Sequence, residues 1–423
     1  MTSRLTILML LTAAVSAAAF DLGELELHGF FDIRAGVRTQ SDPHERDASL
    51  GEMRLQLFNE TFTDNATFAV RADFIYDRVI NSSHTDLEQG LGLIDLREAN
   101  VTLAPLDFVD LKVGRQILTW GVGDLLFIND LFPKDWNSFF AGRDTDYLKA
   151  PSDAMMLSLY SDFADLDFVY TPAFDSDRYI SGDRVSYWNP MLGRRAGRDA
   201  IADPERRSRW FREDEFALRM RQTVQGYELA AYAYHGYWKS PEGFNPLSER
   251  NYYPHLNVYG ASARGTMAGG VVSLEGGYYD SRQDRRGRDP LVPNSQQRYL
   301  VGYEREIVRD LQAGVQYYVE IMQHYGSYRA NLPEGMSSKD ENRHVLTFRL
   351  TKLAMNQNLT LSCFVFWSPS DKDAYLRPNI EYKASDVWHY SVGANVFIGR
   401  DNDSFFGQFE KNNNVYAAVR CNF

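Results

Sequence analysis

The chain has 423 residues, a formal net charge of −12 and only two cysteines. The acidic balance argues against nucleic acid as a partner, and two cysteines cannot build a disulfide framework. No apolar stretch after the N-terminal segment is long enough to cross a bilayer as a helix, which excludes a helical membrane protein. Aromatic residues make up 14% of the chain, although its mean hydropathy is low, at −0.41. This combination suits a barrel with an apolar outer surface and a wet interior.

The first residues have the pattern of a secretory signal peptide. Arg4 is the only charge before Asp21, and an apolar run over 5–15 leads into the small residues 16–19. A basic start, a short apolar core and an Ala-x-Ala end are typical of such signals. We expect cleavage after 19, or one residue earlier; a buried N-terminal helix is the alternative interpretation.

Strict alternation of apolar and polar residues begins directly afterwards, and we treat 20–423 as one domain. One face of the first segment is apolar, with Leu25, Leu27, Phe31, Ile33 and Val37, and the other is mostly polar, with Glu24, Glu26, His28, Asp32 and Arg34. A period of two with one apolar and one charged face is expected for a strand between lipid and a wet lumen. A soluble sandwich core could not accommodate the charged face.

The same alternation marks about 18 segments, although 16 strands is the next best count. They lie near 24–38, 50–63, 66–77, 93–104, 108–119, 153–162, 165–173, 212–223, 226–238, 254–266, 270–281, 296–308, 310–323, 342–354, 357–368, 373–384, 387–399 and 411–423. Tight turns alternate along the chain with long connections. The link 369–372 is the one exception, because it is short although its place in the order predicts a long connection. This asymmetry predicts an all-β fold: a transmembrane antiparallel up-and-down β-barrel in the outer membrane of a Gram-negative bacterium.

The last segment alternates up to the C-terminal Phe423. This ending resembles the signature that outer-membrane barrels present to the barrel assembly machinery, although Cys421 stands where an aromatic residue is often found. Cys421 and Cys363 lie three predicted strands apart, farther than the roughly 7 Å that a disulfide spans between Cα atoms. We therefore expect two free thiols facing lipid.

The connection 120–152 is long yet rich in apolar and aromatic residues, so it needs a surface to pack against. It resembles in position and length the third loop of general porins, which folds inward as a constriction. The alternative is a cap on the outer surface. Its charged residues would then line the narrowest point: Asp124, Asp130, Lys134, Asp135, Arg143, Asp144 and Asp146.

The connection 174–211 is a long basic outer loop and a candidate outer gate. Its distal part carries Arg194, Arg195, Arg198, Arg206, Arg207 and Arg209, with Arg212 just beyond it. Arginine forks bind phosphate and carboxylate groups well. Capture of an anionic solute, contact with the phosphate-rich outer leaflet and a merely solvated loop are all compatible with this composition, and the last two are favoured.

The periodicity also predicts charges of both signs inside the lumen. The candidates are Arg34, Arg71, Arg97, Arg219, Arg221, Arg298, Arg349, Arg377, Glu98 and Glu215. Opposed cations and carboxylates create a transverse field that favours small polar solutes. Arg219 and Arg221 share one face of one segment, so a local basic ladder for anions is an additional hypothesis.

Catalysis and metal binding are weighed and not favoured. The spacing of His389 and Ser391 resembles that in outer-membrane phospholipases, but the periodicity points both into the lumen, where no lipid substrate lies. Acidic pairs such as Asp371 with Asp373 are expected in solvated turns rather than in calcium sites. We predict no enzymatic activity, no cofactor and no metal.

The segment GRQILTWGVGD, from Gly114 to Asp124, resembles a strand-to-loop motif of porin-like and alginate-export-like outer-membrane families. This resemblance implies an aqueous or anionic-polymer channel. We predict a porin-like channel for passive diffusion of small hydrophilic solutes, anions among them. A dedicated exporter of an acidic polysaccharide and a plugged barrel scaffold are the alternatives. Contact with outer-membrane lipid and lipopolysaccharide is expected, and a homotrimer is left open.

Overall fold

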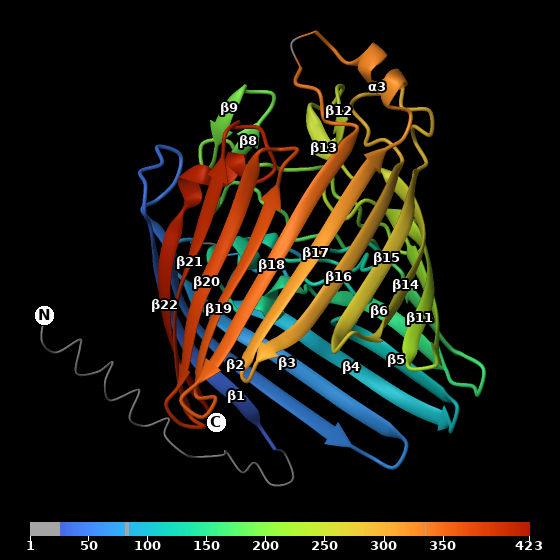
Figure 1. The fold of residues 1–423 in the computed structure, drawn as a ribbon, viewed down its shortest axis with the longest axis vertical. Helices are drawn as coiled ribbons and strands as arrows, with labels where there is room; N and C mark the ends of the chain where they lie inside the picture. The colour runs from blue at the N-terminus through green and yellow to red at the C-terminus, as the bar shows by residue number, and fades with distance from the viewer. Residues whose placement is uncertain (1–25, 81–83, 335) are drawn as a thin grey trace, which may run out of the picture.

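The computed structural model describes residues 26–80, 84–334 and 336–423, and the predicted signal peptide, 1–19, lies outside them. These residues form a closed barrel of eighteen antiparallel strands (Figure 1). Closure is complete because β1 (His28–Arg38) pairs with β2 on one side and with β22 (Asn414–Asn422) on the other. The predicted all-β barrel is confirmed, with 18 strands rather than 16.

Every predicted segment corresponds to one barrel strand. Between β1 and β22 these are β2 (Ala48–Phe62), β3 (Ala66–Asp77), β4 (Ile94–Leu106), β5 (Val109–Gln116), β6 (Ser152–Leu159), β7 (Asp165–Thr171), β10 (Glu215–Val224), β11 (Tyr227–Tyr237), β14 (His255–Met267), β15 (Gly270–Ser281), β16 (Gln296–Val308), β17 (Leu311–Met322), β18 (Asn342–Ala354), β19 (Leu359–Ser368), β20 (Asp373–Lys383) and β21 (Trp388–Gly399). The strand predicted over 108–119 ends early, at Gln116, because the chain turns into the lumen there.

The alternation of the sequence becomes two different surfaces. On β3, Phe68, Val70 and Phe74 point outward and are 48%, 49% and 43% exposed, whereas the inward Asp73 is fully buried. Outward apolar side chains remain favourable only where lipid replaces water. In the described ranges, no helix has the length and apolar character needed to cross a membrane.

Tight turns gather at one end of the barrel and long connections at the other (Figure 1). The turns at Gln225–Gly226 and Ala268–Gly269 each place two consecutive residues at positive φ, the geometry that matches the twist of hairpin strands. The long-connection end carries two small hairpins, β8 (Tyr187–Asn189) with β9 (Arg194–Ala196) and β12 (Gly243–Asn245) with β13 (Arg250–Tyr252). It also carries the helix α3 (Tyr325–Asn331) and the 3₁₀ turn η2 (Gly407–Asn412). Short turns at one end and long loops at the other are typical of membrane-spanning β-barrels.

Both cysteines are free, as expected. They occupy outward positions, but lipid access differs between them. Cys421 is only 3% exposed, and its cross-strand neighbours are the aromatic residues Phe31 and Trp388. Cys363 on β19 is half-buried between Leu350 and Pro378 of the neighbouring strands.

The largest apolar cluster lies inside the barrel, where the connection 120–152 meets the wall. Tyr375 of β20 is fully buried at its centre, and its ring stacks on Phe397 of β21 at 4.4 Å between centroids. Phe139 and Phe140 of the connection pack edge-on against the same Tyr375 ring. The Tyr375 hydroxyl donates to Asn395 Oδ1 at 2.6 Å.

This cluster gives a first prediction, on stability. Tyr375→Ala should lower the free energy of unfolding by about 3–5 kcal/mol because it leaves a cavity among packed rings. Tyr375→Phe keeps the ring and removes only the hydroxyl, so it should cost about 1 kcal/mol. Urea unfolding of the refolded barrel, followed by tryptophan fluorescence, measures both. Equal losses in the two variants would contradict a packing role for the ring.

Candidate pore constriction

The connection 120–152 lies inside the lumen rather than over its mouth. A buried carboxylate on the wall shapes its first turn. Glu275 of β15 accepts hydrogen bonds from the backbone N–H groups of Val122, Gly123 and Asn129 at 3.0, 3.1 and 2.9 Å. At Gly121, with φ of 81°, a Cβ atom would lie 2.8 Å from Glu275 Oε1. A glycine is therefore required where the chain passes this carboxylate.

The middle of the connection forms a short helix, α2 (Trp136–Ala141). Asp135 caps its start by accepting from Ser138 N at 2.7 Å, and Gly142 ends it with φ of 91°. A side chain at 142 would collide with the ring of Tyr416 on β22. The helix is thereby seated against the wall, with Phe139 and Phe140 in the apolar cluster.

Beyond α2, four charged groups join the connection to β1 and β22. Arg34 Nε donates to Asp32 Oδ1 at 2.8 Å, and Arg34 Nη2 reaches Asp144 Oδ1 at 2.5 Å. Arg420 Nη2 bonds to the same two carboxylates, lying 2.9 Å from Asp32 Oδ2 and also contacting Asp144. Burial alone would raise the pKa of Asp144, but the two guanidinium groups outweigh it and hold the pKa below its ordinary value.

Further contacts tie the connection to other parts of the wall. Arg143 Nε donates to Glu52 of β2 at 3.0 Å, and the Tyr147 hydroxyl donates to Asp73 of β3 at 2.8 Å. On another side, Arg349 of β18 binds both oxygens of Asp124, at 2.7 and 2.5 Å. The connection is therefore fixed to β1, β2, β3, β15, β18 and β22 by charged or polar contacts.

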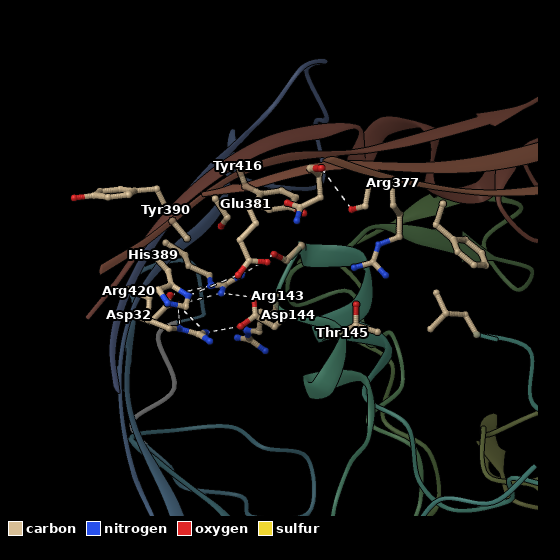
Figure 2. Close-up of a pocket in the computed structure, with 18 of the residues that line it drawn as sticks. Asp32, Arg143, Asp144, Thr145, Arg377, Glu381, His389, Tyr390, Tyr416 and Arg420 are labelled. Carbon is tan, nitrogen blue, oxygen red and sulfur yellow. Dashed lines mark hydrogen bonds and ion pairs between the residues drawn. The ribbon is translucent and has the colours of Figure 1, made fainter. Parts of the chain in front are cut away.

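A polar cavity of about 170 Å³ remains between the connection and the wall formed by β1 and β18–β22 (Figure 2). Its cationic lining consists of Arg34, Arg143, Arg349, Arg377 and Arg420. Four of these five guanidinium groups hold a carboxylate partner. Within the described part of the chain, Arg377 makes no ion pair; its guanidinium lies 4.1 Å from the centre of the Phe139 ring, and its buried Nε has no hydrogen-bond partner.

The structure separates the predicted constriction residues into groups. Arg143 and Asp144 line the cavity, and Asp124 binds the lining Arg349. Asp130 and Lys134 are buried and pair with each other at 2.9 Å, away from the cavity. Asp135 is buried as the helix cap, whereas the Asp146 side chain is exposed. Their role as a constriction stays a prediction.

Most predicted lumen charges are engaged with neighbours. Arg219 and Arg221 each face an aspartate on β7, namely Asp167 at 2.6 Å and Asp165 at 3.2 Å. The proposed basic ladder is therefore a row of ion pairs. The remaining pairs are Arg71 with Glu98, Arg298 with Glu320, Glu215 with Lys239, and Arg97 with Asp95. Arg97 also donates to the carbonyls of Asp146 and Lys149.

The long connection 174–211 contributes two buried arginines that the sequence pattern did not single out. Arg178 binds both oxygens of Asp95 on β4, at 2.7 and 2.8 Å, and lies 3.4 Å from Asp135. Arg184 donates to Ser49 O and pairs with Asp77. No periodicity marks such residues, because the segment that carries them is irregular.

The predicted basic residues of this connection lie farther along it. Arg195 pairs with Glu410, Arg206 with Asp86, and Arg207 with Glu213. Arg194 pairs with Asp199, and Arg198 donates to Val79 O. The contacts with Glu410, Asp86 and Val79 join the connection to neighbouring connections, whereas Asp199 belongs to the connection itself and Glu213 lies just beyond it.

His389 and Ser391 both line the cavity. This agrees with the apolar–polar alternation of their strand, which predicted that both side chains point into the lumen. His389 Nδ1 lies 3.8 Å from Glu381 Oε1 (Figure 2). Asp371 pairs with Arg343 at 2.6 Å. Asp373 accepts from Phe406 N and is only 2% exposed at the start of β20, so its expected place in a solvated turn is wrong.

Another group of acids was not predicted. Among the described residues, the carboxylates of Glu88, Asp153 and Asp175 approach within 4.8 Å of one another. Arg115 already pairs with the first two of them.

The low pKa of Asp144 predicts a pH effect. A carboxyl with a depressed folded-state pKa stabilises the fold above its unfolded value, and this stability is lost as the pH falls through the folded value. Asp144→Asn should cost about 1 kcal/mol at pH 7, a modest value because the side chain is 36% exposed. The difference between parent and variant should shrink below about pH 4. Urea midpoints from pH 7 to 3 measure it, and a constant difference would refute this role.

Comparisons with known proteins give a consistent picture of the fold. No family model matches the chain, and no curated protein matches it in sequence. Among solved structures, OccAB3 of Acinetobacter baumannii matches at 12% identity and a TM-score of 0.54, covering 95% of this chain and 100% of that chain. OccAB1 of the same species matches at 9% identity and 0.55, covering 96% and 98%.

A third match is OccD3 of Pseudomonas aeruginosa, at 11% identity and a TM-score of 0.52, covering 94% of this chain and 91% of that chain. These neighbours are outer-membrane porins. Because the identities are low, the likeness concerns the path of the backbone. The chain has the fold of the outer-membrane porins.

Proposed function

We propose that the protein is an outer-membrane channel for passive diffusion of small hydrophilic solutes, with the connection 120–152 as its constriction. The observation that carries this proposal is the placement of that connection inside a closed barrel, tied to the wall on several sides, with a polar cavity beside it. A barrel of this strand number encloses enough space for an aqueous path. The porin fold supports the same conclusion.

Selection by size and charge would occur at the cavity. Its lining carries charges of both signs: Arg34 and Arg420 contact Asp32 and Asp144, and Glu381 lies on the same wall. Arg377 differs from the others because no carboxylate of the described chain neutralises it. We assign to Arg377 the preference for small anions, since an unpaired guanidinium offers a fork to a carboxylate or phosphate.

The outer connection 174–211 would act as a fixed collar with a basic rim. Its first part is anchored by the buried Arg178 and Arg184, so an opening motion there would break buried ion pairs. The proposal also includes how the protein reaches the membrane: residues 1–19 would direct export as a signal peptide, and the C-terminal Phe423 would be recognised by the barrel assembly machinery. The backbone of Phe423 exchanges two hydrogen bonds of 3.0 Å with Gly29, which places it in the closing seam.

One observation favours a second candidate, the plugged scaffold. The connection contacts the wall on many sides, and its apolar residues fill part of the lumen. Reconstitution into planar bilayers separates the two: regular open steps support a channel, and absence of conductance supports the scaffold. The exporter of an acidic polysaccharide gains little support, because most lumen arginines are already neutralised.

Ion selectivity tests the role of Arg377. Arg377→Gln should reduce the preference for anions, measured as the reversal potential across a salt gradient, because it removes the unpaired cation of the cavity. Arg219→Gln is the matched variant: it also removes one positive charge from the lumen, but from an arginine whose partner is Asp167. We expect the larger shift for Arg377→Gln. Equal shifts would show that overall lumen charge sets the selectivity.

The absence of enzymatic activity stays part of the proposal. His389 and Ser391 share the cavity with Glu381, so the parent protein and His389→Ala should both be assayed for lipid and ester hydrolysis. We expect no turnover from either. Turnover that disappears in His389→Ala would overturn this part of the proposal.

A further inference from the structure

On the outer wall of the barrel, the outward side chains change from apolar to polar at the long-connection end of β11, β14 and β15. Lower on this wall the outward side chains are apolar or aromatic, such as Leu274, Tyr259 and Tyr278. Beyond them the outward positions become polar: His235 Nδ1 lies 2.8 Å from Asn257 Oδ1, and Asn257 Nδ2 lies 3.5 Å from Asp280 Oδ2. An apolar lipid-facing surface therefore gives way to a hydrogen-bonded row across three strands.

Strand register places this change relative to the membrane surface. Tyr259 pairs with Tyr278, and the next outward pair is Asn257 with Asp280. One further step brings His255 next to Arg282, whose backbone N–H donates to the carbonyl of His255 at 3.1 Å. Exposed tyrosines of barrels lie at the membrane–water interface. His255 and Arg282 are four residues beyond Tyr259 and Tyr278, about 14 Å along strands that are tilted to the membrane normal. His255 and Arg282 thus lie at the level of lipid headgroups.

A cavity of about 230 Å³ opens at this level, lined by His255, Arg282, Gln283 and Arg285. Its wall is ordered by specific contacts. Arg285 is held by both oxygens of Asp280 at 2.9 and 2.7 Å, and Gln283 accepts from His255 N at 3.0 Å. The His255 ring packs on Tyr237 at 4.6 Å between centroids.

Asp280 neutralises Arg285, so among the described residues the free cation of the lining is Arg282. In the described part of the chain, the Arg282 side chain has neither an ion pair nor a hydrogen bond, so its guanidinium is available to a ligand. The segment 282–288 contains four arginines and a single acid, Asp284. Asp284 is turned to its own loop, where its carboxylate accepts from Asp289 N at 2.6 Å. The cavity is therefore cationic and sits above an apolar wall.

We propose that this cavity binds a phosphate group of an outer-leaflet glycolipid, with Arg282 as the principal contact and Arg285, His255 and Gln283 as supporting donors. An arginine fork fits phosphate oxygens. The site faces the bilayer, and acyl chains below the headgroup would lie along Tyr259, Tyr278 and Leu274. This placement commits the site to a lipid phosphate rather than to free phosphate. The inference rests on the outer-membrane location in the proposed function and does not require an open channel.

The test uses the purified mature barrel in detergent. Native mass spectrometry compares retention of bisphosphorylated lipid A with retention of the same lipid after removal of its phosphates. Arg282→Gln should weaken binding of the phosphorylated lipid about tenfold, the effect of losing one charge-assisted contact. Arg309→Gln is the matched control, because Arg309 is 95% exposed in a tight turn at the opposite end of the barrel; we expect no change.

Each outcome decides the proposal. Selective loss in Arg282→Gln, confined to the phosphorylated lipid, supports it. Equal binding by parent and Arg282→Gln, or equal binding of both lipids by the parent, overturns it. Inorganic phosphate that displaces the lipid completely at equal concentration would identify a free-phosphate site and overturn the assignment to lipid. Conductance should be unchanged in Arg282→Gln, so failure here is distinguishable from failure of the channel proposal.

Discussion

The rest of this structure depends on one constraint, the closure of the backbone hydrogen-bond ladder between β1 and β22. Lipid offers no partner for a free N–H or C=O group, so a spanning sheet is stable only without an edge. Closure also fixes which residues of β1 and β22 lie side by side. Once β1 places Asp32 and Arg34 inside, β22 must place Arg420 beside them. The anchor that receives Asp144 of the inner connection is a direct consequence.

The strands were predictable from sequence because their signal is local. A period of two shows which face of the strand a residue occupies, and the turns between segments give the number of strands. Together they predicted about eighteen strands, with sixteen as the next count. Cross-strand partners need the register, which alternation alone does not give. For this reason Arg219 and Arg221 were predicted as a ladder, while the structure pairs them with Asp167 and Asp165.

Irregular segments are harder to interpret, although their composition still carries information. The apolar content of 120–152 predicted that it must pack, and the lumen provides the surface. Its fold, however, depends on single residues that are distant in sequence, such as Glu275, which accepts hydrogen bonds from its backbone. No pattern within 120–152 predicts that contact. Arg178 and Arg184 were missed for the same reason: their carboxylate partners come from distant segments. A buried arginine is stable only with such partners, so its role becomes visible only in three dimensions.

The attachment of the inner connection to widely separated strands has a mechanical consequence. Bonds from Asp124 to β18 and from Asp144 and Arg143 to β1, β22 and β2 act as a cross-brace inside a hollow tube. A tube without a brace flattens readily under lateral pressure, whereas a braced one must break ion pairs before its cross-section becomes oval. The distance between β18 and the seam of β22 and β1 is therefore held by ion pairs through the lumen as well as by the sheet itself.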